Sequence, residues 1–156
     1  MAMKNPTNKN KMKGSTWERQ VAKALSIWIY GKDQVIRRHP TSGAEKGYGD
    51  GADIAVFQPG YDPFNYFVEA KRGYKDDIFN ARKQLHEWYQ VAQTKNTKNN
   101  PIWIVWKVLN RGVILASNKK FNEVQELFIL EDLYLYDFKE LLQKNFKEIT
   151  KEKEDK

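Results

Sequence analysis

The chain has no cysteine and only two histidines among its 156 residues. The lack of cysteine excludes disulfides, thiolate metal sites and a cysteine nucleophile, and it is compatible with a reducing compartment. The two histidines, His39 and His86, are far apart in the sequence and differently placed, so they do not suggest a two-histidine metal site. Zinc coordination is therefore not expected.

Long apolar runs are also missing. The longest, such as those at residues 101–106 and 113–116, are far shorter than the roughly 20 residues that cross a bilayer. The N-terminal residues are polar and lysine-rich, without the apolar run and small-residue cleavage site of a secretory signal. We therefore expect no membrane partner, and we expect the protein to remain in the cytoplasm in which it is made.

Acidic residues are outnumbered. The 27 Lys and Arg residues against 20 Asp and Glu residues give a net charge of +7 at pH 7. This excess favours an anionic partner, nucleic acid first, although a basic protein can also carry its charge only for solubility. Apolar residues make up 40% of the chain, which is enough for one hydrophobic core.

Hydrophobic spacing predicts helices in three places. Ser15 or Thr16 caps a first helix that continues to about Trp28. A second helix covers residues 77–93, and a third follows Asp137 as its cap. Five β-type segments lie between these helices, at residues 34–38, 52–58, 66–71, 101–109 and 113–116.

Turn residues between the strands indicate two hairpins. Residues 59–63 join the second and third strands, and residues 110–112 join the last two. The expected fold class is therefore α/β, with a central mixed sheet flanked by helices.

The chain shows no internal repeat and no linker, so we expect a single domain with appended segments. Residues 1–13 are interpreted as a disordered basic arm and residues 14–118 as the core domain. Residues 119–150 are interpreted as a helical extension of the same domain, and residues 151–156 as a charged tail.

Charged side chains interrupt two of the apolar strands. The period of two in a strand places Glu69 and Lys71 on one face, and Val68 and Ala70 on the other. Asp53 lies at the start of the neighbouring strand, so charged groups gather in an otherwise apolar sheet. Since buried charges are costly unless they are paired or bound to a metal, this cluster indicates a function.

The cluster suits metal-dependent phosphodiester hydrolysis. Mg²⁺ binds one or two carboxylates together with water and phosphate oxygens, so Asp53 and Glu69, with the Ala70 carbonyl, are candidate ligands. Lys71 can orient or deprotonate the attacking water, or neutralise charge on the phosphate. Glu18, in the first turn of the first predicted helix, would complete the acidic pocket or hold a second ion.

Each of these residues also has a simpler interpretation. Glu-x-Lys is common in exposed strands as a solvated pair that contributes little. Glu18 can be a first-turn carboxylate that interacts with the helix dipole. Asp53 can merely end the glycine-rich loop predicted at residues 40–51, with Asp50 as its functional substitute. Their joint order along the chain favours the active-site interpretation.

That order resembles one family, the PD-(D/E)xK nucleases, and within it the archaeal-type Holliday-junction resolvases, including phage-encoded versions. The resemblance covers roughly residues 14–116. Its matching features are residues 14–19, Arg38 with residues 40–44, residues 53–54, residues 67–71, residues 83–89 and the strand at 102–107. The chain departs from the family in having Ala52, not proline, before Asp53 and a longer insertion before Glu69.

The resemblance implies a restriction-endonuclease-like fold with an α-β-β-β-α-β-β core. It implies that Glu18, Asp53 and Glu69 bind Mg²⁺, for which Mn²⁺ can substitute, and that Lys71 is the catalytic lysine. Three further residues are implied to act near the scissile phosphate or to face the site from the second helix: Arg38, Ser42 and Gln84.

The implied substrate is DNA, above all a four-way junction that is resolved by paired symmetric cuts. Because such a junction is nearly two-fold symmetric, we expect a homodimer. A phage-encoded enzyme would act in the host cytoplasm. The alternatives are a nickase, repair or restriction-type member of the same superfamily, a non-catalytic DNA-binding module, and an RNA-directed nuclease.

Overall fold

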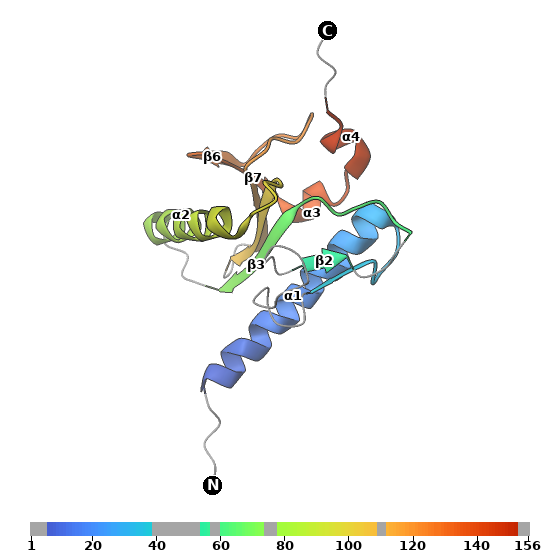
Figure 1. Cartoon of the computed structure of the whole chain (residues 1–156). Helices are drawn as coiled ribbons and strands as arrows, with labels where there is room; N and C mark the ends of the chain where they lie inside the picture. The colour runs from blue at the N-terminus through green and yellow to red at the C-terminus, as the bar shows by residue number, and fades with distance from the viewer. Residues whose placement is uncertain (1–5, 39–53, 57–59, 74–77, 109–111, 153–156) are drawn as a thin grey trace.

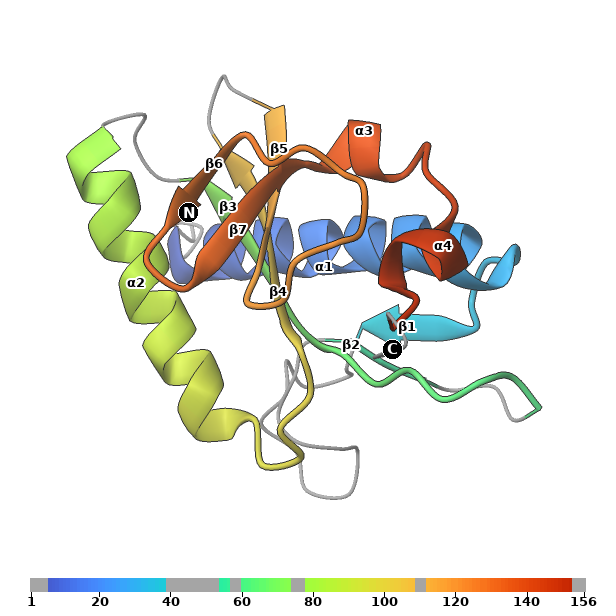
Figure 2. The same ribbon diagram turned by 90° about the horizontal axis from the view of Figure 1, so that it is seen from above.

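The computed structural model describes the backbone of residues 6–38, 54–56, 60–73, 78–108 and 112–152. It contains a five-stranded sheet with helices on both faces, and a separate two-stranded sheet beside it (Figure 1). Helix α2 covers one face of the large sheet, and α1, α3 and α4 lie on the other side (Figure 2). This arrangement confirms the predicted α/β class with a mixed sheet between helices.

The helices are short apart from α1 and α2, and none in the described part of the chain is long and apolar enough to cross a membrane. The elements in chain order are α1 Pro6–Tyr30, β1 Ile36–Arg38, β2 Ile54–Val56, β3 Phe67–Gly73, α2 Ile78–Lys95, β4 Ile102–Val108, β5 Gly112–Ser117, β6 Phe128–Leu130, β7 Leu133–Asp137, α3 Phe138–Leu141 and α4 Phe146–Thr150.

The large sheet has the order β3-β4-β5-β7-β6. Strands β3 and β4 are parallel and are joined by α2, whereas the other neighbours are antiparallel. The predicted second hairpin is therefore confirmed as β4 and β5. Strand β4 is buried on both faces from Ile102 to Trp106, which explains its unbroken apolar sequence.

Two apolar layers fix the sheet between the helices. On the α2 side, Leu85, Trp88 and Ala92 pack with Phe67 of β3. On the α1 side, Trp17 belongs to a second buried cluster, and its indole Nε1 donates a hydrogen bond to the Val105 carbonyl, 3.3 Å away. This bond ties α1 to the centre of the sheet.

Helix α1 begins at Pro6, so the predicted cap at Ser15 or Thr16 was wrong. Proline is well suited to the first position of a helix because its fixed φ matches the helix and its missing N–H would have no partner there. No other proline occurs before Pro40, and Gly14, the single glycine within α1, costs only about 1 kcal/mol, so nothing ends the helix early.

The small sheet differs from the first predicted hairpin. Strand β2 pairs antiparallel with β1, from Ile36 opposite Val56 to Arg38 opposite Ile54. Strand β2 also contacts β3, although β1 is its hydrogen-bonded partner among the described residues. The prediction that β2 and β3 are neighbours thus holds, and the prediction that they form the hairpin does not.

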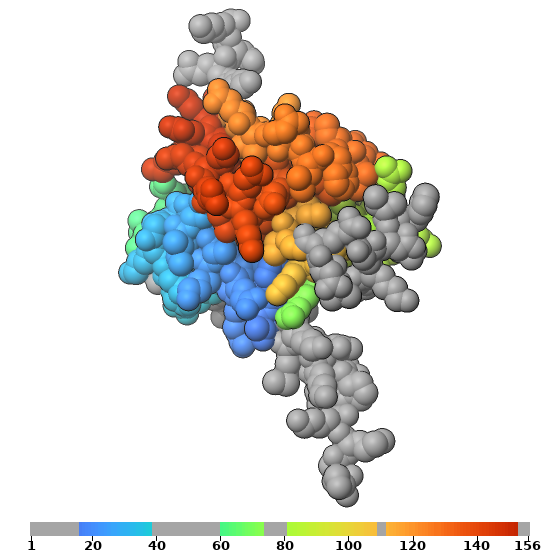
Figure 3. All heavy atoms as spheres, turned by 180° about the vertical axis from the view of Figure 1, so that it is seen from behind, coloured from blue at the N-terminus to red at the C-terminus, as the bar shows by residue number. Residues whose placement is uncertain are grey.

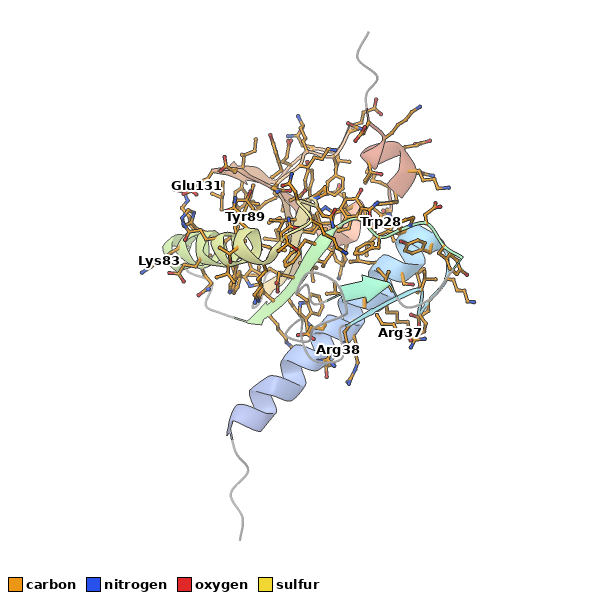
Figure 4. The ribbon with its side chains drawn as sticks, in the orientation of Figure 1. Trp28, Arg37, Arg38, Lys83, Tyr89 and Glu131 are labelled. Atoms are coloured by element: carbon orange, nitrogen blue, oxygen red, sulfur yellow. The ribbon has the colours of Figure 1, made fainter. Side chains whose placement is uncertain are left out.

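The C-terminal extension is not purely helical, because β6 and β7 complete the large sheet. The alternation of Leu133 and Leu135 toward the α2 side, with Tyr136 on the opposite face, is a strand pattern that the helical interpretation overlooked. Seen from behind, the C-terminal residues pack directly over α1 (Figure 3). On the other face, Glu131 lies beside α2 (Figure 4). Its Oε2 is 2.6 Å from Nδ1 of His86 on α2.

Asp137 caps α3, as the sequence predicted: its Oδ1 accepts a hydrogen bond from the Glu140 N–H, 3.2 Å away. Replacing Asp137 with Ala removes this acceptor, so we expect the free energy of unfolding to fall by about 1 kcal/mol. Urea denaturation followed by circular dichroism measures the loss. Asp132→Ala, at an exposed turn position, is the control, and an equal loss in both variants would contradict the cap assignment.

Candidate active site

Glu69 and Lys71 lie on the face of β3 that points toward α2. Their neighbours Val68 and Ala70 are buried in the cluster on the opposite face, so the predicted alternation is confirmed. The register places Glu69 opposite Ile104 of β4, and the glutamate is only 4% exposed. A carboxylate is thus held inside an apolar layer by the backbone of a central βαβ unit.

The carboxylate of Glu69 lies between two ammonium groups. Its Oε2 is 3.9 Å from Lys71 Nζ, and its Oε1 is 3.9 Å from Lys95 Nζ. Both distances are too long for hydrogen bonds. Oε1 is buried and has no hydrogen-bond partner in the described part of the protein. Because buried polar atoms are normally satisfied, this oxygen points to a ligand that completes the site.

Lys71 is held by a second contact. Its Nζ lies 5.7 Å from the centroid of the Trp88 ring on α2, within the range of a cation–π interaction. The Lys71 side chain is 32% exposed, so its ammonium group is accessible at the edge of the buried carboxylate. Lys71 can therefore contact an anion that approaches Glu69 from solvent.

Glu18 and Arg38 form an ion pair between α1 and the end of β1. Arg38 Nε donates to Glu18 Oε2 at 2.9 Å, and the side chains are 17% and 11% exposed. The stick view places Arg38 beside α1 (Figure 4). Since α1 begins at Pro6, Glu18 lies well inside the helix, and an interaction with the helix N-terminus no longer explains it.

Of the other predicted site residues, the structure describes Gln84 but not Asp53 or Ser42. Gln84 is half-buried on α2, one turn before Trp88, so the two share a face of the helix. Asp53 and Ser42 lie outside the described residues. Among residues whose side chains are described, which exclude Asp53, no three His, Asp or Glu residues cluster as a metal site.

A family described as "Phage putative PDDEXK endonuclease" matches residues 9–154. The chain belongs to this family. No curated protein and no solved structure matches it.

Membership of the PDDEXK family makes the chain a nuclease, and it confirms the superfamily that the order of Glu18, Asp53, Glu69 and Lys71 indicated. The family match also agrees with a phage origin and with DNA as the partner. The junction-resolving type stays a prediction.

PDDEXK nucleases generally use divalent metal ions, and the residues described here fit such an ion. The partnerless Oε1 of Glu69 is a hard oxygen donor, which is the type of ligand that Mg²⁺ and Mn²⁺ prefer. Lys71 and Lys95 partly offset the charge of this carboxylate, and each ammonium is far enough from it to leave room for a closer ligand.

Lys95 also lies at the candidate site, beside Glu69, although no sequence pattern indicated it. It is the last residue of α2, many positions after Glu69, and no Glu-x-Lys spacing marks it. The parallel β3–α2–β4 crossover is the signal that could have found it. A helix in such a crossover runs back along the strands, so its C-terminal end returns to the start of β3.

A cavity of about 280 Å³ lies on the other side of the sheet, next to α4. It contains neither Glu69 nor Lys71, so the candidate site rests on the carboxylate and its cations and not on this cavity. The cavity is lined by Tyr66, Pro101, Trp103, Ser117, Lys119, Lys120, Phe121, Asn122, Ile149, Thr150, Lys151 and Glu152.

Proposed function

We propose that this PDDEXK nuclease is a metal-dependent DNA endonuclease that resolves four-way junctions by paired, symmetric phosphodiester hydrolysis. The observation that carries the hydrolytic part is the buried Glu69 carboxylate, with one oxygen lacking a hydrogen bond and Lys71 Nζ 3.9 Å from the other. The preference for junctions is supported by the resemblance of residues 14–116 to archaeal-type resolvases.

Glu69 is the central ligand of the proposed metal site, together with Glu18, Asp53 and the Ala70 carbonyl. A bound Mg²⁺ or Mn²⁺ ion supplies Lewis-acid polarisation of the phosphoryl group. The protein contributes a fixed carboxylate on β3, whose position is set by the parallel pairing with β4. A rigid strand holds such a ligand more accurately than a loop does.

Lys71 is the proposed catalytic lysine. Its ammonium group can donate hydrogen bonds to a non-bridging phosphate oxygen, where negative charge grows during attack by water. The Trp88 ring limits the directions that this side chain can take, so less conformational entropy is lost when it binds phosphate. Gln84, one turn earlier on α2, is proposed to assist from the same helix face.

Arg38 is proposed to position the DNA backbone. The Glu18 carboxylate fixes the direction of its guanidinium at 2.9 Å, and a guanidinium is well matched to phosphate geometry. Ser42 follows Arg38 closely in the sequence and is proposed to act near the same phosphate. These contacts hold the substrate without reading its base sequence.

A homodimer is proposed because a four-way junction needs two matched incisions. Two copies related by a two-fold axis carry two identical active sites. These sites can cut a symmetric pair of junction strands, either the two continuous strands or the two exchanging strands. The net charge of +7 per chain adds to +14 in the dimer, which favours binding to the dense phosphates at a branch point.

We expect the protein to introduce paired nicks at symmetric positions in a synthetic four-way DNA junction when Mg²⁺ or Mn²⁺ is present, and none in EDTA. Denaturing gels with each strand labelled in turn measure the cut positions. Linear duplex, single-stranded DNA and an RNA junction of the same sequence are the controls.

The other outcomes separate the alternatives. Equal cutting of all DNA forms would replace junction resolution with another endonuclease activity, and cutting of linear duplex at one sequence would select a restriction-type enzyme. Preference for the RNA junction would identify an RNA-directed nuclease. Junction binding without cutting in either metal would indicate a DNA-binding module and overturn the proposal.

A further inference from the structure

Lys95 contacts the same carboxylate as the proposed catalytic lysine, but from the opposite side. Lys71 Nζ is next to Oε2 of Glu69, whereas Lys95 Nζ is next to Oε1. We propose that Lys95 is an exchangeable counter-ion: it pairs with Glu69 in the metal-free protein and moves to a DNA phosphate when a divalent cation takes its place. This inference rests on the proposed function.

The distance between Lys95 and Glu69 favours exchange over a permanent bridge. At 3.9 Å the ammonium group offsets the charge of Oε1 without satisfying it as a hydrogen-bond acceptor. A divalent cation that bound Oε1 directly would supply both a closer contact and a higher charge. Lys95 thus lies beside Oε1 as a competitor that a divalent cation can displace.

The two partners also differ in freedom to move. Glu69 is fixed in a buried strand, with its side chain 5% exposed, whereas the Lys95 side chain is 46% exposed at the end of α2. A cation at Oε1 would repel the Lys95 ammonium, and the long lysine stem allows it to turn toward solvent. In the proposed exchange, the Lys95 side chain therefore moves and the Glu69 carboxylate remains in place.

Lys71 does not share this freedom. It is less exposed, at 32%, and its ammonium is also held near the Trp88 ring. The structure therefore assigns different roles to the two lysines: Lys71 remains beside the reacting phosphate, and Lys95 leaves the carboxylate. Once it has left, Lys95 adds a positive charge to the surface that the DNA approaches.

Exchange couples the binding of metal to the binding of DNA. A phosphate that attracts Lys95 removes a competitor from Glu69, so DNA should strengthen metal binding, and metal should strengthen DNA binding by the same factor. In the metal-free protein, Lys95 is neutralised by Glu69 and contributes less to DNA affinity. Simple electrostatic attraction between Lys95 and DNA predicts no such dependence on metal.

Lys95→Gln tests the exchange by removing the charge while keeping a side chain of similar length. We expect it to bind Mn²⁺ roughly fivefold more tightly than the unmodified protein without DNA, which is within the usual range of coupling between two binding events. Isothermal titration calorimetry on the full chain measures this directly, and Lys95→Arg should restore the original affinity. Lys98→Gln, an exposed lysine in the following loop, is the matched control and should change nothing.

The second arm measures junction affinity by fluorescence anisotropy in EDTA and in Ca²⁺, with a gel to verify that the DNA is intact. The gain in affinity on adding Ca²⁺ should be large for the unmodified protein and for Lys98→Gln, and smaller for Lys95→Gln. Unchanged or weaker Mn²⁺ binding by Lys95→Gln, in a protein that binds metal and cuts DNA, would overturn the exchange alone. No Mn²⁺ binding and no cleavage by the unmodified protein would overturn the proposed function as well.

Discussion

Glu69→Gln is expected to lower the rate of DNA cleavage by roughly 10³-fold, because the loss of a metal-binding carboxylate removes about 4 kcal/mol of transition-state stabilisation. The fold should be unaffected. The carboxylate that is removed is buried and lacks one hydrogen bond, and the two lysines beside it both reach solvent. Buried charged side chains that serve function often add nothing to the free energy of unfolding, or lower it.

Single-turnover cleavage of the labelled substrate in Mg²⁺, together with the thermal midpoint, separates the two effects. Glu87→Gln, the same change at an exposed position of α2, is the control and should cut DNA at the original rate. Retained cleavage in Glu69→Gln would show that the Glu-x-Lys strand is not the active site. A large drop in the thermal midpoint would instead indicate that Glu69 supports the fold.

The helix and the strands of the central βαβ unit could be predicted from the sequence because their signals are local, whereas the parallel pairing of β3 with β4 was not predicted. Helix α2 shows apolar residues at helical spacing, and β4 and β5 are short apolar runs separated by turn-type residues in the sequence. The pair of Glu69 and Lys71 follows from the period of a strand alone. The family match then confirmed the superfamily to which this spacing belongs.

The errors occur where local patterns permit two structures. The start of the first helix was misplaced because lysine and asparagine near Pro6 suit both a solvated segment and a helix, and α1 continues outward from its buried part. Residues 133–137 contain leucines and tyrosines that suit a strand or a helix, and pairing with β5 and β6 makes them a strand.

The candidate site was predictable only where its members are close in sequence. Lys95 reaches Glu69 through the return of α2 across β3, which is a tertiary effect. The pairing of Arg38 with Glu18 likewise joins a strand to a helix, and no spacing rule specifies it. The family resemblance implied that Arg38 and Glu18 act at the site, but it did not indicate that they contact each other.

The C-terminal extension is joined to the catalytic core by aromatic packing, and Trp103 is at the centre of it. This β4 residue is 1% exposed, and its ring stacks on Tyr66 at a centroid distance of 4.1 Å. It also contacts Trp28 of α1 and two rings of the extension, Phe121 and Phe146. The strand after Glu69 and Lys71 and the extension therefore depend on one cluster.

Trp103→Ala should lower the free energy of unfolding by about 3–5 kcal/mol, since it leaves a large cavity and removes several aromatic contacts at once. Native domains have only about 5–15 kcal/mol in total, so the variant should be close to unfolding at room temperature. Urea denaturation followed by far-UV circular dichroism and by fluorescence measures the loss. Trp103→Phe keeps a ring in the cluster and should lose less, and Ile27→Ala, at a position that is 48% exposed, should lose less than about 0.5 kcal/mol.

The number of unfolding transitions tests whether the C-terminal extension and the core form one domain. If residues 119–150 belong to the same domain as β3 and β4, both probes should report one transition in every variant, because strand β7 and the Trp103 cluster cross the boundary. Two separate transitions would contradict this and would make the extension an independent unit. A single transition would mean that the strand carrying Glu69 and Lys71 is stabilised by the C-terminal residues, so truncating them should abolish cleavage through the fold and not through the chemistry.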